Sequence, residues 1–144
     1  MAVSRSMRRL LQVLEIQEEE CRAAMESARA ELSRLERALT RNVERERGGR
    51  RLVAVSATTG EITDRIVGIE ETRTAKRVAA ALAPRIREVE AAVNERRSQF
   101  LGKRIERRQA ETLIEETEAL DRVEAERRAQ RDLDDWGLSR RGSI

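Results

Sequence analysis

The sequence predicts an all-α protein, a long antiparallel coiled coil of two helices joined by a short irregular or helical turn region. Seam positions recur in alternating steps of four and three from residue 7 to residue 42, and nearly all of them are apolar. This is the heptad repeat of a helix with one narrow apolar seam. Charged residues make up 40% of the 144 residues and aromatic residues 1%, a composition typical of coiled coils. A second periodic stretch of similar length follows, so the seam has a predicted partner within the same chain.

The first helix is expected over residues 4–47, where neither glycine nor proline interrupts the pattern. Ser4 and Ser6 are candidate N-caps, since a serine hydroxyl accepts hydrogen bonds from the first backbone N–H groups. Glu18 and Asn42 occupy two seam positions, where a polar residue either fixes the register of the pair or is merely tolerated. The apolar seam positions of this helix are Met7, Leu11, Leu14, Cys21, Met25, Ala28, Leu32, Leu35 and Leu39.

The turn region is expected over residues 48–74. The Gly48-Gly49 pair favours a helix end or a hinge, and Gly60 breaks the pattern again. Residues 50–59 are ambiguous between extended structure and a continued helix. One short helix is expected after Gly60, on the spacing of Ile62, Ile66 and Ile69.

The second long helix is expected over residues 75–136, followed by a tail at 137–144. Pro84 lies inside this stretch, so either the helix bends there or it starts there. The matched lengths of the two helices favour a hairpin over a parallel dimer of separate chains, and the regular seam argues against disorder. The predicted seam positions of this helix are Val89, Val93, Leu113 and Leu120.

The residue types argue against catalysis and against a bound metal or cofactor. The chain contains no histidine and one cysteine, and it has no glycine-rich phosphate-binding motif. The 30 basic residues are interspersed with 27 acidic ones, so no concentrated basic face for nucleic acid is expected. Neither a secretory signal nor an apolar run of about 18 residues is visible, so we expect no direct membrane insertion.

The C-terminal region carries the most specific pattern in the chain. A basic cluster is followed directly by an acidic cluster, and then by Trp136 and Leu138. Tryptophan often anchors an interface. The alternative is that Trp136 packs on the first helix, against Val3, Met7 or Leu10. The basic cluster is Arg127, Arg128 and Arg131, and the acidic one is Asp132, Asp134 and Asp135.

This ending resembles the C-terminus of the flagellar FliJ family and, more loosely, of the YscO-type proteins of type III secretion. In that family an Arg/Glu-rich helix ends in Gln-x-x-x-Asp-(Asp/Glu), an apolar or aromatic residue and a basic tail. The chain length and the two-helix layout are also similar. The residues that fill these places are Gln130, Asp134, Asp135, Trp136, Arg140 and Arg141.

The resemblance implies a cytoplasmic protein peripheral to the inner-membrane export apparatus. Such a stalk binds and stimulates the hexameric export ATPase, connects it to the membrane protein of the export gate, and interacts with export chaperones. On this interpretation residues 50–75 face the gate. The residues implied to contact the ATPase are Arg8, Arg9, Arg127, Arg128, Arg131, Asp134, Asp135 and Trp136.

Three alternatives stay open on the sequence alone. The first is an injectisome stalk of the YscO type. The second is a generic coiled-coil scaffold or dimerisation module with an unrelated partner. The third is a binder of nucleic acid or of a membrane surface that uses its arginine-rich helix faces.

Overall fold

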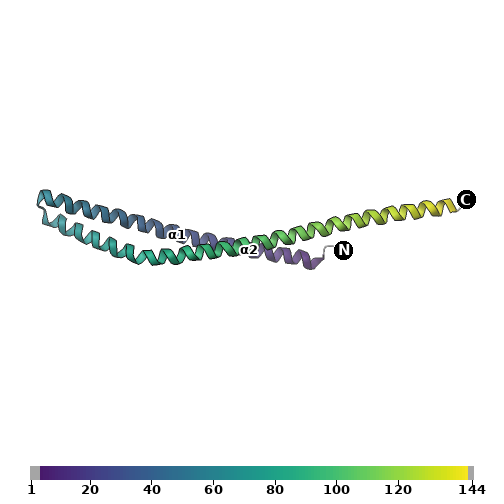
Figure 1. Cartoon of the computed structure of the whole chain (residues 1–144), viewed down its shortest axis with the longest axis horizontal. Helices are drawn as coiled ribbons and strands as arrows, with labels where there is room; N and C mark the ends of the chain where they lie inside the picture. Colours follow the sequence, from purple (N-terminus) through teal and green to yellow (C-terminus); the bar gives the residue numbers. More distant parts are fainter. Residues whose placement is uncertain (1–3, 143–144) are drawn as a thin grey trace. The chain divides into compact units, whose positions relative to one another are not determined.

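The computed structural model describes residues 4–142, and all but three of these residues are α-helical. Helix α1 spans Arg5–Thr59 and helix α2 spans Ile62–Gly142, with only Gly60 and Glu61 between them. The two helices pack against each other in opposite directions (Figure 1), which confirms the predicted all-α helical hairpin. No strand occurs among residues 4–142.

Contacts divide the chain into two compact units, and each helix contributes to both. The terminal unit comprises residues 1–20 and 100–144, and the turn unit comprises residues 21–99. Each unit is therefore a pair of antiparallel helical segments, and each is described below by itself. At the start of α1 the Ser4 hydroxyl accepts a hydrogen bond from the Met7 N–H at 3.1 Å, so Ser4 is the N-cap.

The turn region of the turn unit is much shorter than the sequence predicted. The expectation of an irregular segment over residues 48–74 is wrong, because α1 continues to Thr59 and α2 begins at Ile62. The chain reverses at Gly60, whose φ of +74° is a conformation that favours glycine. The Gly60 N–H donates to the Ser56 carbonyl at 2.9 Å, which closes the end of α1.

The glycines that suggested a helix end instead let the two helices touch. A Cβ atom on Gly49 would lie 2.7 Å from the Gly68 carbonyl oxygen, and one on Gly68 would lie 2.6 Å from the Gly49 carbonyl oxygen. Both distances are too short for any larger residue without movement. Close backbone packing therefore offsets the low helix propensity of glycine at these two positions.

Small residues dominate the interior of the turn unit. Ser56 and Ala75 are buried together with the two glycines, and the Ser56 hydroxyl is satisfied by donating to the Val53 carbonyl at 2.7 Å. Among the predicted seam residues, Met25, Ala28 and Val89 are buried in this unit. The half-buried ones are Cys21, Leu32, Leu35, Leu39 and Val93.

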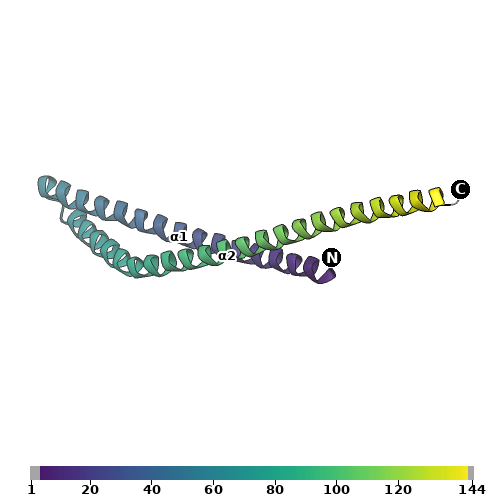
Figure 2. The ribbon, with the colours of Figure 1, turned by 45° about the vertical axis from the view of Figure 1, so that its right-hand side comes forward.

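Pro84 lies well inside α2, so the helix does not start there. The teal part of the α2 ribbon bends (Figure 2), in the region of the turn unit that contains this proline. Proline has no N–H to donate to the carbonyl four residues earlier, and its ring crowds that carbonyl. A bend therefore accommodates Pro84, and α2 continues beyond it.

The predicted seam of α2 in the terminal unit is wrong. Leu113 and Leu120 are 53% and 65% exposed. Because α2 is unbroken, the heptad phase of Val89 and Val93 continues, and polar residues occupy most of the inward positions. These half-buried positions are Phe100, Lys103, Arg107, Ala110, Ile114, Thr117 and Asp121. On α1 the predicted residues do face inward, with Leu14 buried and Met7 and Leu11 half-buried.

The predicted tail is also helical. We expected the second helix to end at residue 136, but α2 runs on to Gly142, and residues 143–144 lie outside the described part of the chain. Arg140 and Arg141 lie in the last turn of α2, where cations favour the negative end of the helix dipole.

Candidate partner-binding surfaces

A charged pair crosses the seam of the terminal unit. The Arg107 guanidinium donates two hydrogen bonds to the Glu18 carboxylate, one of them at 3.4 Å, and a third at 2.8 Å to Glu111. The side chains of Arg107 and Glu18 are only 21% and 16% exposed. The hydrogen bond to Glu18 is the main reason that the pKa of Arg107 is raised. A polar seam residue either fixes the register of the two helices or is merely tolerated. The Arg107–Glu18 pair favours the first interpretation for Glu18.

Asn42 behaves differently from Glu18. Its side-chain amide donates to the Ala38 carbonyl at 2.8 Å, within its own helix. A bond of this kind satisfies the amide locally and carries no information about the opposite helix. Asn42 is therefore an example of a polar residue that the seam tolerates.

A second ion pair joins the helices of the terminal unit. Arg8 lies 3.6 Å from Glu118, although both side chains are well exposed, so this pair contributes little by itself. Here the base belongs to α1 and the acid to α2, whereas in the Arg107–Glu18 pair the base belongs to α2 and the acid to α1.

Ion pairs also join the helices of the turn unit. Arg45 binds Glu71 with two hydrogen bonds, one of them at 3.0 Å, and Arg85 binds Glu31. The hydrogen bond from Arg45 holds the pKa of the Glu71 carboxyl below its usual value and raises the pKa of Arg45. These bidentate or short contacts hold the two helices in one register along one side of the seam.

The C-terminal part of α2 extends past the start of α1 within the terminal unit (Figure 1). Every residue from 122 to 136 is exposed. This segment contains all of the predicted partner-binding residues except Arg8 and Arg9, which are exposed near the start of α1. Arg8 contacts Glu118, which lies more than two turns before Arg127, so the structure does not gather the predicted arginines into one cluster.

Trp136 does not pack on α1. Its side chain is 60% exposed, and the Arg140 guanidinium lies 4.8 Å from the centre of its ring. The expectation of packing against Met7 or Leu10 is therefore wrong, and Val3 lies outside the described residues. Asp134 accepts a hydrogen bond from the Gln130 amide at 3.2 Å, which links two residues of the C-terminal pattern on one helix face.

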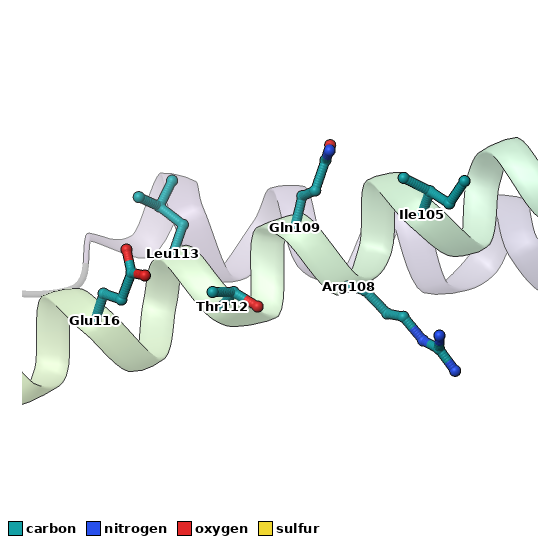
Figure 3. A pocket seen from close by; sticks show the side chains of 6 residues that line it. All are labelled: Ile105, Arg108, Gln109, Thr112, Leu113 and Glu116. Carbon is teal, nitrogen blue, oxygen red and sulfur yellow. The ribbon is translucent and has the colours of Figure 1, made fainter.

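The terminal unit has an exposed apolar surface that the sequence did not predict, because Leu113 was expected in the seam. A shallow groove of about 510 Å³ is lined by residues of α2 alone, and Figure 3 shows their side chains. Continuing the heptad phase from Val89 and Val93 would have revealed it, because this phase places Leu113 and Leu120 outside the seam. The groove is lined by Ile105, Arg108, Gln109, Thr112, Leu113 and Glu116.

Among residues 4–142, no helix has the length and apolar content needed to cross a membrane. The same range holds no group of three or more His, Cys, Asp or Glu side chains placed to bind a metal ion. Comparison of the chain with protein-family models, with curated proteins and with solved structures found no match.

Proposed function

We propose that this chain is a coiled-coil stalk of a type III protein export system, of the flagellar kind in the first place. In this role it is not an enzyme. It binds and stimulates a hexameric export ATPase and connects that ATPase to the export gate and to export chaperones. The proposal draws on the C-terminal pattern of Gln130, Asp134, Asp135 and Trp136 and on the two-helix hairpin.

The observation that carries the proposal is the exposed segment 122–136 of α2. A single helix of this length is only marginally stable in water, because most helical stability comes from packing against a neighbour. A segment that is exposed around its whole circumference is suited to a partner that surrounds it. The inner surface of a hexameric ring is such a partner.

The charges of this segment fit a ring with acidic inner loops. Residues 122–142 contain six arginines and five carboxylates, distributed around the helix and not on one stripe. Arg127, Arg128 and Arg131 lie close together on one face of α2, because residues three and four positions apart are neighbours on a helix surface. Attraction between these arginines and acidic loops of the ring would orient the two proteins as they associate.

The turn region would supply the contact with the export gate. Val55, Ile62 and Ile66 are 51%, 73% and 57% exposed around the Gly60 reversal. Exposed apolar side chains that are close in sequence are a feature of interaction sites. An injectisome stalk of the YscO type would use the same surfaces, so the ATPase that responds to the chain distinguishes the two systems.

The test is ATPase stimulation by a charge-reversal variant. The triple variant Arg127→Glu, Arg128→Glu and Arg131→Glu changes only exposed side chains. We expect it to lose stimulation by about tenfold or more, which corresponds to roughly 1.4 kcal/mol of binding free energy. Circular dichroism should show unchanged helicity.

The matched control is a second triple reversal with the same change of charge. Arg34, Arg37 and Arg41 are exposed on α1 in the turn unit, and their substitution by Glu should leave stimulation near that of the wild type. If the C-terminal triple variant stimulates the ATPase as well as the wild type does, the stalk assignment is wrong. Equal loss in both variants would indicate a non-specific charge effect and would also contradict it.

A further inference from the structure

The two sides of the seam differ in charge within the turn unit. In an antiparallel pair, the e positions of both helices lie on one side of the seam with the b positions next to them, and the g positions lie on the other side. Arg50 on α1 and Ile69 and Arg73 on α2 mark the first side, because they line one groove of about 280 Å³. The ion pair between Arg45 and Glu71 marks the second side.

The side with the e positions carries basic and aliphatic residues but no acidic ones between residues 40 and 83. This segment contains nine basic and six acidic residues, and all six acids occupy other heptad positions or the loop. Every e and b residue of its two helical stretches is exposed. Together these residues form the basic flank, which consists of Thr40, Val43, Arg47, Arg50, Ala54 and Ala57 on α1, and of Ile62, Ile66, Ile69, Arg73, Lys76, Ala80 and Ala83 on α2.

The cations of the basic flank remain accessible from solvent. The side chains of Arg47, Arg50 and Arg73 are 64–70% exposed, and each contacts only an acid of its own helix, at 3.1, 2.7 and 4.0 Å. Exposed ion pairs of this kind contribute little, so they compete weakly with an external anion. Lys76 has no acidic partner among the residues that the structure describes.

The groove at the centre of the basic flank joins the two kinds of side chain. Its lining includes the aliphatic residues Val53 and Ile69, together with one arginine from each helix, Arg50 and Arg73. The Thr72 hydroxyl, which also lies in the lining, already donates a hydrogen bond to a carbonyl of its own helix at 2.8 Å. Guanidinium groups bind phosphate oxygens in a bidentate manner. The groove therefore suits a phosphate group that is attached to hydrocarbon.

The aliphatic side chains of the basic flank distinguish between the anions that it could bind. Ile62 and Ile66 are 73% and 57% exposed close to the Gly60 reversal. Nucleic acids offer phosphates and bases, and single strands are bound by stacking on aromatic side chains, but residues 21–99 contain no Phe, Trp or Tyr. Aliphatic residues interleaved with Lys and Arg are instead typical of proteins that lie in the interface of an anionic membrane.

We propose that the basic flank binds the surface of an anionic lipid bilayer. The basic residues contact lipid phosphates, and Ile62 and Ile66 enter the layer of headgroups. No helix among residues 4–142 is suited to cross a membrane, so this contact is peripheral. The proposal goes beyond the proposed ATPase contact, because it uses none of the residues 122–136 and is tested on the chain alone.

The first test is flotation of the full chain with lipid vesicles at physiological salt. The chain should bind vesicles of phosphatidylcholine that contain about 30% phosphatidylglycerol at least about tenfold more tightly than vesicles of phosphatidylcholine alone. Added salt should weaken the binding, because it screens the attraction. A chain that stays unbound to the anionic vesicles, or that binds both kinds equally, would refute the proposal.

The second test reverses two charges of the basic flank. Arg73→Glu with Lys76→Glu should lower the affinity for the anionic vesicles by at least about thirtyfold, since each basic residue near such a surface contributes a factor of about five. The matched control is Arg34→Glu with Arg41→Glu, which reverses two exposed charges at c positions, on the other side of the seam. The control should stay within about threefold of the wild type, because its charges lie farther from the lipid than the screening length of about 8 Å. Equal losses in the two variants would contradict a contact through the basic flank.

The third test separates a membrane from a polyanion such as duplex DNA. Ile62→Ser with Ile66→Ser keeps every charge and should lower the affinity for the anionic vesicles by about tenfold or more, because less apolar surface leaves water. The matched control is Val13→Ser with Ile16→Ser, two exposed residues of the terminal unit, and it should bind vesicles as the wild type does. If the wild type binds duplex DNA more tightly than vesicles, or if the Ile62 and Ile66 substitutions change nothing, the proposal is wrong.

Discussion

Replacement of Gly49 by alanine measures how closely the two helices of the turn unit approach. A Cβ atom at this position would lie 2.6 Å from the Thr72 hydroxyl oxygen and 2.7 Å from the Gly68 carbonyl oxygen. The Thr72 hydroxyl itself donates to that carbonyl at 2.8 Å, so moving it breaks a hydrogen bond. The helices must then separate by several tenths of an ångström to admit a methyl group.

Two opposing terms set the size of this effect. Alanine in a helix interior is more favourable than glycine by about 0.8–1.0 kcal/mol. Overpacking a close contact costs about 1–3 kcal/mol, and the upper part of that range applies when backbone atoms are the obstacle. Gly49→Ala should therefore destabilise the hairpin by about 1–2 kcal/mol, as the net of these terms.

The neighbouring glycine provides the matched control. A Cβ atom on Gly48 would meet no atom within 4 Å, so Gly48→Ala should stabilise the hairpin by about 0.5–1 kcal/mol. Urea denaturation followed by circular dichroism at 222 nm measures both variants. The two substitutions are chemically identical and adjacent, so opposite shifts of the midpoint isolate the packing term. If both variants were stabilised equally, the Gly49–Gly68 contact would not be as close as described.

Three further predictions concern single contacts. Glu18→Leu alone should lower the thermal midpoint because the half-buried Arg107 guanidinium loses its partner across the seam and keeps only Glu111, whereas adding Arg107→Leu should restore the midpoint. The pKa of Glu71 is lowered in the folded hairpin, so its bond to Arg45 stabilises above the ordinary value of 4.5 and is lost as the pH falls. Glu71→Gln should therefore show a smaller drop in melting temperature below that pH than the wild type. Pro84→Ala should raise the free energy of unfolding by up to about 3 kcal/mol, because it restores a backbone N–H donor inside α2. The change is measured as a higher midpoint in urea denaturation.

The fold class could be predicted because apolar residues recur with a regular heptad period in the first helix. Leu14, Met25 and Ala28 all occupy positions of the same heptad seam, and all three are buried in the structure. A narrow apolar seam needs a second helix, and only one other stretch of the chain is long enough to supply it. The N-cap at Ser4 was also recognisable, because it depends on local chemistry alone.

The position of the turn could not be predicted from local propensity. Gly49 and Gly68 weaken a helix in isolation, and their value appears only when two helices cross at that point. Such a contact joins residues that are far apart in sequence. Gly60 carries the same local signal as the other glycines, but it is the one that adopts the left-handed conformation.

The seam of α2 in the terminal unit was predicted wrongly because its positions were chosen by hydrophobicity. In a continuous helix, the heptad phase set by Val89 and Val93 determines which residues face α1. Leu113 and Leu120 are exposed, whereas Ile114, which is just as apolar, and Thr117 are half-buried toward α1. A continuous helix cannot shift its phase to favour a leucine. Partner-binding residues were predicted by type and by resemblance, and the exposure of Arg127, Arg131 and Trp136 is compatible with such a role.

The polar seam of the terminal unit makes the pairing of its helices sensitive to the surrounding electrolyte. Little apolar surface is buried when these two segments pack together, because four seam positions of α2 are polar. They are Lys103, Arg107, Thr117 and Asp121. Coulombic attraction weakens as dissolved ions accumulate, with a screening length of about 8 Å at physiological salt. The steric fit of Gly49 to Gly68 is indifferent to salt. Salt screens the ion pairs of both units, but the turn unit keeps its close Gly49–Gly68 contact, so rising ionic strength should weaken the pairing of the terminal segments more than the pairing near the turn.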